Sequence, residues 1–354
     1  MAQADDTRSG TVSLPAGLSL DPRSPRTVWA AAAALILLTL IVCLIAFGPA
    51  MEFPTTVDTY EEPTPAGNTV TITRTVRQVT GGWIDDAVKW LTVEGSWLFG
   101  PLKEGVTYAL VYIENVLKWI PWPVVVLSLA ILSFAIGRWA LLGFTVAALL
   151  FIGFMGLWEN TVDTLALMVV SVFISVAIGL PLGVFAARNE LANNIMRPIL
   201  DGMQTMPSFV YLLPGVLFFG LGPPAGVFAT IIYAVPPVIR LTNLGIRQVS
   251  AETVEAARSF GTTPYQLLTK VQIPMAMPTI MAGVNQTTMM ALAMVTIASM
   301  VAAGGLGDNV LRALQKNQSG NGAIAGLAIV FLAIIIDRLT QSVARQQNER
   351  ISAG

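Results

Sequence analysis

Residues 247–274 read RQVSAETVEAARSFGTTPYQLLTKVQIP, a polar stretch between two apolar runs of the chain. The pattern predicts two short helices on either side of a glycine. Ser250 can cap the first helix, and Gly261 suits the left-handed position at its end. Pro264 then fits the first turn of a second helix, and Pro274 is expected to close it where the next apolar run begins. We therefore expect a rigid helix pair that serves as a docking element.

The rest of the chain places this stretch beside a membrane. The protein has 354 residues, of which 54% are hydrophobic and 12% charged, with a mean hydropathy of +0.68. A transmembrane helix needs about 20 mostly apolar residues. The composition therefore predicts an all-α polytopic membrane protein with about eight spans. The candidate spans are 29–47, 122–137, 140–158, 164–187, 207–220, 226–239, 277–303 and 323–337.

The basic residues orient these spans. Lys and Arg are enriched in cytoplasmic loops, and the rule applies best to short loops. With both termini in the cytoplasm, the short outer loops hold only Arg312 and Lys316, while the inner segments hold most of the remaining basic residues. We therefore expect cytoplasmic termini, with the loop 247–274 on the cytoplasmic side as well.

The first apolar run has two interpretations. Residues 1–28 are expected to be a disordered cytoplasmic tail, and residues 29–47 either an uncleaved signal-anchor helix or the apolar part of a cleaved signal peptide. We favour the anchor because the run is long for a signal peptide and a poor cleavage sequence follows it. At the other end of the chain, residues 346–354 are predicted to form a short cytoplasmic tail.

Segment 48–121 is expected to lie outside the membrane. Residues 54–80 read as a loop with at most one weak hairpin. Two amphipathic helices, 83–99 and 102–120, should follow and lie along the membrane interface, divided by Gly100 and Pro101.

Three tryptophans in this segment allow a sharper hypothesis. Trp83, Trp90 and Trp97 belong to residue types that form aromatic cages around quaternary ammonium groups. Their seven-residue spacing, however, places them in a row along one face. We therefore favour an anchoring face at the lipid headgroups.

Several chemistries are excluded by composition. The chain has no histidine and a single cysteine, Cys43, so His-based catalysis, Cys/His metal sites and intrachain disulfides are absent. A net charge of −1 disfavours nucleic-acid binding. The phosphate-loop pattern G-x-x-x-x-G-K-[ST] does not occur, so the chain is not expected to be an enzyme or to bind ATP or another cofactor by itself.

A polar stripe marks the seventh predicted span. Asn285, Thr288, Thr296 and Ser299 fall in one arc of about 80° at about 100° per residue. Polar groups inside the hydrocarbon need partners, which either a neighbouring helix or a water-filled passage supplies. The stripe is thus either a packing contact or the lining of a translocation path.

Ionisable residues are expected only at span ends, as with Glu159, Asp163 and Asp337. Ion-coupled carriers usually hold such residues at depth. Their absence there argues against a proton- or ion-coupled secondary carrier and suits a solute without net charge.

The opening stretch also carries a family resemblance. Glu255, Ala256 and Ala257, then Gly261, then the run 271–274 resemble the EAA motif, E-A-A-x3-G-x9-I-x-L-P, of binding-protein-dependent ABC importer permeases. The spacing agrees throughout, with conservative changes near the end. The resemblance implies that an ATPase is coupled to this chain through Glu255, Ala256, Ala257, Gly261, Ile273 and Pro274.

Longer runs resemble one branch of those permeases. GLPLGVFAARN at 179–189 and AVPPVIRLTNLGIRQV at 234–249 are similar to the glycine betaine/proline betaine permeases of ProU-type importers, and the resemblance covers roughly 120–345. It implies a type I ABC importer fold with a five-helix core, in which 159–345 is the permease core and 122–158 contributes two accessory spans.

The same resemblance implies function and partners. The expected function is import of glycine betaine, proline betaine or a related quaternary-amine osmoprotectant across a bacterial inner membrane. The expected partners are a second permease copy, two ATPase subunits that bind ATP, and an extracytoplasmic solute-binding protein. The alternatives are a permease for choline or an amino acid, and an ATP-independent carrier or channel.

Overall fold

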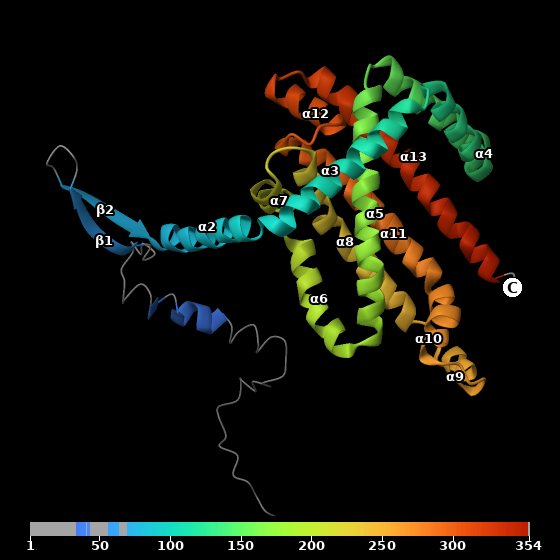
Figure 1. Cartoon of the computed structure of the whole chain (residues 1–354), viewed down its shortest axis with the longest axis horizontal. Coiled ribbons are helices and arrows are strands. Elements are labelled where there is room, and N and C mark those ends of the chain that lie inside the picture. Colours follow the sequence, from blue (N-terminus) through green and yellow to red (C-terminus); the bar gives the residue numbers. More distant parts are fainter. Residues whose placement is uncertain (1–32, 40, 43–55, 64–68, 353–354) are drawn as a thin grey trace, which may run out of the picture. The chain divides into compact units, whose positions relative to one another are not determined.

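A computed structural model describes residues 33–39, 41–42, 56–63 and 69–352. The described chain is almost entirely helical (Figure 1). It divides into two compact units, Met1–Asp85 and Asp86–Gly354, which we treat separately.

The first unit contains one β-hairpin. Strand β1 (Thr56–Pro63) pairs antiparallel with β2 (Thr69–Thr75), with Thr59 opposite Thr73. β-Branched residues such as these threonines favour strands, and the hairpin foreseen within 54–80 is present. Of the predicted anchor 29–47, residues 33–39 and 41–42 are helical. The remainder of that prediction, and the tail 1–28, lie outside the described residues.

The break between the two amphipathic helices falls earlier than predicted. Helix α2 spans Val76–Glu94 and α3 spans Ser96–Trp119, so Gly95 divides them and Pro101 lies inside α3. Gly95 has φ −84° and ψ 2°, and its carbonyl accepts the N–H groups of Leu98 and Phe99 to start the new helix. Pro101 lies only six residues into α3, where it removes one backbone hydrogen bond without ending the helix.

Helix α4 (Trp122–Phe154) folds back on itself. The hydroxyls of Ser133 and Thr145 lie 2.8 Å apart, whereas residues twelve apart in a straight helix are separated by about 18 Å. Its two arms, Trp122–Gly137 and Trp139–Phe154, correspond to the two predicted accessory helices, and the first arm meets α3 at 90°.

Three long helices form the centre of the second unit: α5 (Trp158–Arg188), α8 (Pro223–Arg247) and α11 (Ile273–Ala298). Glycines allow their backbones to approach closely. A Cβ on Gly183 would lie 2.6 Å from the Cβ of Thr242, and one on Gly283 would lie 3.0 Å from the Cβ of Leu241. Small residues at such contacts are typical of membrane helix packing.

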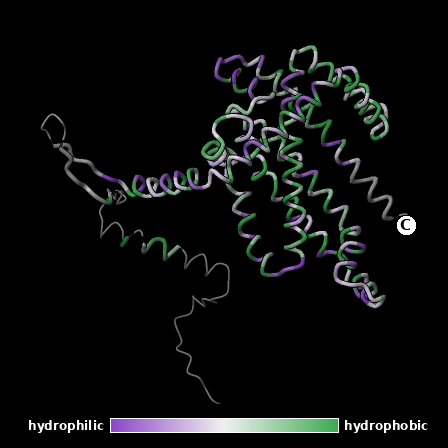
Figure 2. The backbone as a smooth tube through the Cα atoms, viewed as in Figure 1, coloured by the Kyte–Doolittle hydropathy of each residue, from purple (hydrophilic) through white to green (hydrophobic). Residues whose placement is uncertain are grey.

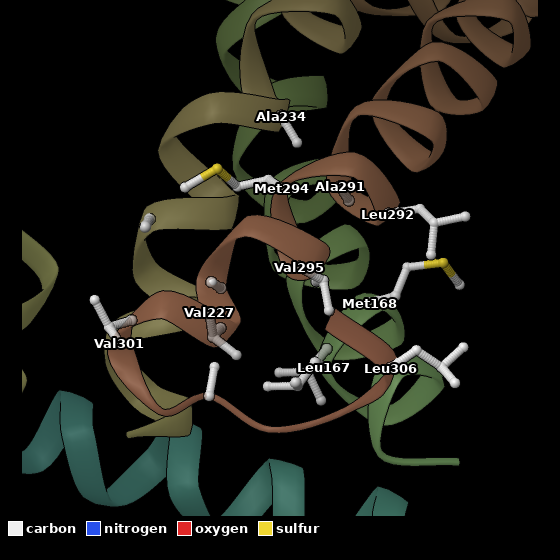
Figure 3. Close-up of a cluster of buried hydrophobic side chains, with 14 of the residues drawn as sticks. Leu167, Met168, Val227, Ala234, Ala291, Leu292, Met294, Val295, Val301 and Leu306 are labelled. Atoms are coloured by element: carbon white, nitrogen blue, oxygen red, sulfur yellow. The ribbon is translucent and has the colours of Figure 1, made fainter. Parts of the chain in front are cut away.

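The main apolar core lies among these helices. Figure 3 shows Leu167 of α5, Val227 of α8 and Val295 of α11 converging with Leu306. In Figure 2 the hydrophobic residues concentrate along the helices, while hydrophilic ones gather around α12 (Leu306–Gln315) at one end, and around α9 (Ala251–Ser259) and the turn between α5 and α6 (Glu190–Thr205) at the other. An apolar belt between two polar ends is the pattern of a membrane protein.

The predicted fifth span, 207–220, forms one arm of a bent helix pair in the structure. Its helical part comprises a 3₁₀ turn, Ser208–Tyr211, and α7 (Leu212–Phe219), whose eight residues extend only about 12 Å. Residues 190–205, expected in a loop, form α6 (Glu190–Thr205), which packs on α5 and α8. α6 and the 3₁₀–α7 segment meet at 108°. α6 was missed because its polar side chains, paired with α8, resemble those of a loop.

Other helix ends also differ from the predictions. α8 continues past the predicted end at 239 to Arg247, and α13 runs from Ser319 to Ser352 where a span 323–337 and a separate tail were expected. An unpredicted amphipathic helix, α12 (Leu306–Gln315), packs on α13. At the end of α8 and in α12, tertiary contacts accompany a helix that hydropathy alone does not mark.

By length and composition, four described helices can cross a membrane, or six if each bent pair counts as one span. Those four are Trp158–Arg188, Pro223–Arg247, Pro264–Val301 and Ser319–Ser342. The count of eight and the placement of both termini stay predictions.

Candidate functional site

The first half of the loop between α8 and α11 forms a capped helix. Helix α9 spans Ala251–Ser259, and the Ser250 hydroxyl accepts the Thr253 N–H at 3.4 Å. At its other end Gly261 has φ +78° and donates its N–H to the Arg258 carbonyl at 2.9 Å. The predicted cap and the predicted left-handed glycine are both confirmed.

The second half begins as predicted but does not end at Pro274. Thr263 and Gln266 form a capping box around the short helix α10 (Pro264–Gln266), with Pro264 in its first turn. The chain then passes through a π-helical turn, Leu267–Gln272, directly into α11.

The π turn explains why Pro274 does not close the helix. Pro274 has no N–H, so one carbonyl of the preceding turn lacks its usual partner. In the wide π turn N–H groups reach back five residues, as Ile273 does to the Leu268 carbonyl. The altered bonding accommodates the proline, and the loop 247–274 therefore continues without a break into a long helix.

The residues of the EAA motif differ in their exposure. Glu255, Ala256, Gly261 and Pro274 are exposed, whereas Ala257 and Ile273 are half-buried. Buried Leu268 anchors the loop in an apolar cluster with three further buried residues, Ile246 of α8 and Ala276 and Ile280 of α11. The loop therefore offers an exposed polar surface on a fixed apolar base, at one end of the helix body (Figure 1).

Two aromatic residues of this loop were not singled out from the sequence. The Phe260 side chain is 89% exposed and that of Tyr265 72%, on either side of Gly261. Aromatic side chains are enriched among the residues that contribute most to protein interfaces. The available signal was their position beside a glycine between two short polar helices.

The four polar residues of the predicted stripe on α11 do not share a common partner. The hydroxyls of Thr288, Thr296 and Ser299 donate to carbonyls of α11 itself at 2.8, 3.0 and 2.8 Å. Thr288 and Ser299 are also buried. These three residues satisfy their polar atoms within their own helix.

Asn285 instead joins α11 to α13. Its Nδ2 donates to Asp337 Oδ1 at 3.3 Å, and its Oδ1 accepts from the Thr340 hydroxyl. Gln341 Nε2 also donates to Asp337, at 2.7 Å. Because they are in contact, Asn285 and Asp337 lie at one depth, whereas the sequence suggested a buried amide and a terminal acid. Of the two roles left open for Asn285, the contact favours packing.

Comparison with known proteins identifies the group to which this chain belongs. Residues 179–352 match the family model described as binding-protein-dependent transport system inner membrane component. The chain is also 47% identical over 268 residues to the glycine betaine/proline betaine transport system permease protein ProW of Escherichia coli (strain K12), covering 76% of each chain. The chain belongs to this permease family.

Two further relatives extend the match to nearly their full length. The permease is 47% identical to the glycine betaine/carnitine transport permease protein GbuB of Listeria monocytogenes serotype 1/2a, covering 73% of this chain and 93% of that one. It is 43% identical to the glycine betaine transport system permease protein OpuAB of Bacillus subtilis (strain 168), covering 76% and 96%.

A solved structure supports the fold. An inward-facing form of the MetNI methionine ABC transporter aligns with a TM-score of 0.50 and 22% identity, over 54% of this permease and 95% of that chain. The permease thus has the helical fold of type I ABC importer permeases, and it is an integral membrane transport subunit.

Proposed function

We propose that this permease is the membrane subunit of an ABC importer that moves glycine betaine, proline betaine or a related quaternary-amine compatible solute into the cell. The substrate assignment rests on the 47% identity to a relative named for glycine betaine and proline betaine. A multi-pass position in a bacterial inner membrane follows from the family.

The single observation that carries the coupling role is the geometry of the loop 247–274. Leu268 packs in a buried apolar cluster that holds the loop in place. Gly261, at φ +78°, makes the turn between its two helices, and the Phe260 ring is exposed at that turn. Such an element transmits force because it moves as one piece with α8 and α11. ATP would be bound by a partner subunit, and the permease would have no ATPase site of its own.

The proposed assembly has two permease copies and two ATPase subunits, each ATPase holding one loop, with an extracytoplasmic binding protein that delivers solute. The EAA residues Glu255, Ala256, Ala257, Gly261, Ile273 and Pro274 would contact the ATPase or shape the surface that does. Closing of the ATPases would draw the two loops together and reorient the helices as rigid bodies.

A permease for choline or an amino acid is the nearest alternative. The choline transport system permease protein OpuBB of Bacillus subtilis (strain 168) is 30% identical over 178 residues of this chain, a weaker and shorter match than those to the betaine relatives.

The test is uptake by proteoliposomes that hold the permease co-expressed with its ATPase, plus the purified binding protein. We expect ATP-dependent uptake of labelled glycine betaine that unlabelled proline betaine inhibits and an equal concentration of histidine does not. Uptake without ATP, or uptake of choline but not betaine, would contradict the proposal.

A further inference from the structure

Helix α6 is attached to α8 by apolar packing and by polar contacts. Buried Leu200 of α6 packs in a cluster with Val235 and Ile239 of α8. Asn243 Nδ2 donates to Asn193 Oδ1 at 2.8 Å, and ion pairs join Arg240 to Asp201 and Arg247 to Glu190. The polar contacts therefore add directional links to an apolar contact that already holds α6 on α8.

Arg247 differs from the other members of this set because, from the end of α8, it binds both α5 and α6 while also bonding within its own helix. Its Nε donates to Asn243 Oδ1 on α8 at 2.7 Å, its Nη2 to the Ala186 carbonyl on α5 at 2.8 Å, and its Nη1 to the Glu190 carboxylate on α6. The planar guanidinium fixes the directions of all three bonds, which a lysine ammonium cannot reproduce. Arg240, by contrast, makes one ion pair, to Asp201.

Arg247 also lies at the base of the coupling loop. It is the last residue of α8, and the α9 cap Ser250 follows three residues later. Its partners Ala186 and Glu190 lie on either side of Asn189, whose side chain caps α6 by accepting the Leu191 N–H at 2.9 Å. A displacement of the loop therefore reaches the α5–α6 turn through this guanidinium.

We propose that Arg247 is a positioning residue that transmits movement of the coupling loop to the α5–α6 turn, so that α6 moves with α8 when the ATPases close. The inference rests on the proposed function, because it requires an ATPase on the loop. It assigns transmission to a residue outside the EAA motif itself. The competing role is purely structural, in which Arg247 only holds the helices together.

The experiment compares Arg247→Lys with the unmodified importer in proteoliposomes and measures solute transported per ATP hydrolysed. Lysine keeps the charge and can still pair with Glu190, but it cannot also donate the hydrogen bonds that the guanidinium makes to Ala186 and Asn243. Mutations along coupling networks change coupling by up to about tenfold or somewhat more. We expect that transport per ATP falls about tenfold while ATPase co-purification and melting temperature stay within error of the unmodified complex.

Arg240→Lys is the matched control. It makes the same chemical change seven residues earlier, on an ion pair that lacks a contact to α5 among the described residues, and should leave transport per ATP within about twofold. Glu190→Gln, which keeps a hydrogen-bond acceptor, should give a loss between those of the two arginine variants.

An unchanged transport-to-ATP ratio in Arg247→Lys would overturn the proposal. So would loss of the assembled complex in both Arg247→Lys and Glu190→Gln, because that outcome assigns a structural role. If the unmodified complex shows no ATP-driven uptake of any tested solute, the proposed function fails first, and this result is seen before any variant is made.

Discussion

At the scale of single residues, the loop concentrates its function in Gly261 and Phe260. Gly261 has φ +78° with open space around its Cα, so the obstacle to a side chain there is backbone strain and not a clash. Phe260 presents almost its whole ring to the surroundings. One residue sets the angle between the two helices, and the other supplies apolar area at the turn.

Gly261→Val should abolish solute uptake and weaken ATPase co-purification while membrane insertion stays normal. A β-branched residue in the left-handed region costs about 1–2 kcal/mol or more and tilts α9 against α10. The measurement is uptake together with the amount of ATPase retained on the purified permease.

Gly261→Asn is the control, because asparagine tolerates the left-handed conformation, and it should retain most uptake. Full transport by Gly261→Val with the ATPase bound would show that this loop is not the coupling element.

Phe260→Ala should weaken ATPase binding by about 2 kcal/mol, the usual loss for an aromatic hot spot, which is about 30-fold in affinity. Titration of the ATPase onto permease in nanodiscs measures it. Phe154→Ala removes an equally exposed ring at the end of α4 and should leave the affinity unchanged. If both variants bind the ATPase with the same affinity, Phe260 does not contribute to the interface.

Glu255→Lys should also abolish uptake with normal insertion, because Glu255 is exposed on α9 and a carboxylate there suits basic or amide partners. Uptake at the unmodified rate would show that this carboxylate is not needed for docking.

At the scale of helices, the contact between α11 and α13 is polar where most of the interior is apolar. Asn285 lies between the Asp337 carboxylate and the Thr340 hydroxyl, both of which have further partners on α13. An apolar side chain at 285 would take one partner from each of these part-buried groups, and an unsatisfied polar group destabilises a protein more than the loss of a single net hydrogen bond.

Asn285→Leu should lower the free energy of unfolding by about 1–3 kcal/mol and reduce uptake only in proportion to the complex that is lost. Melting temperature in detergent and uptake per assembled complex are the two measurements. Thr288→Val is the control, because that hydroxyl bonds only within its own helix, and it should be nearly neutral in stability. An unchanged melting temperature together with a loss of uptake would show instead that Asn285 lines the translocation path.

At the scale of the whole molecule, the order of helices determines which loops can meet an ATPase. α8 leads into α9, and α10 continues into α11, so the coupling loop is bonded covalently to two of the three central helices. The third central helix, α5, is reached through packing and through Arg247.

A reporter fused near residue 20 should behave as cytoplasmic and one near residue 65 as external, because the apolar run 29–47 separates them and the basic residues precede it. Paired alkaline phosphatase and fluorescent-protein fusions measure this. A cytoplasmic reporter at 65 would refute the eight-span topology.

Local chemistry explains which elements could be predicted. Caps, prolines and glycines act within a few residues, so the Ser250 cap, the Gly261 turn and the Pro264 start follow from the sequence. The two arms of α4 follow from the interruption of an apolar run. These signals are independent of the rest of the chain.

The elements that were missed depend on partners distant in sequence. α6 is stabilised by contacts with α8, in which Leu200 packs against Val235 and Ile239 and the acids of α6 pair with Arg240 and Arg247. Pro274 is tolerated because the π turn before it is held by the Leu268 cluster. Neither compensation is visible in a local window.

Hydropathy and short motifs act through nearby residues, so the membrane class, the family and the rigid loop could be read from the chain alone. The contact of Asn285 with α13, the exposure of Phe260 and the link that Arg247 makes from α8 to α5 and α6 emerge only from the folded helices. The physical reason is that the direction of a side chain, and the partner that satisfies it, depend on how helices pack, and packing brings together residues that the sequence separates.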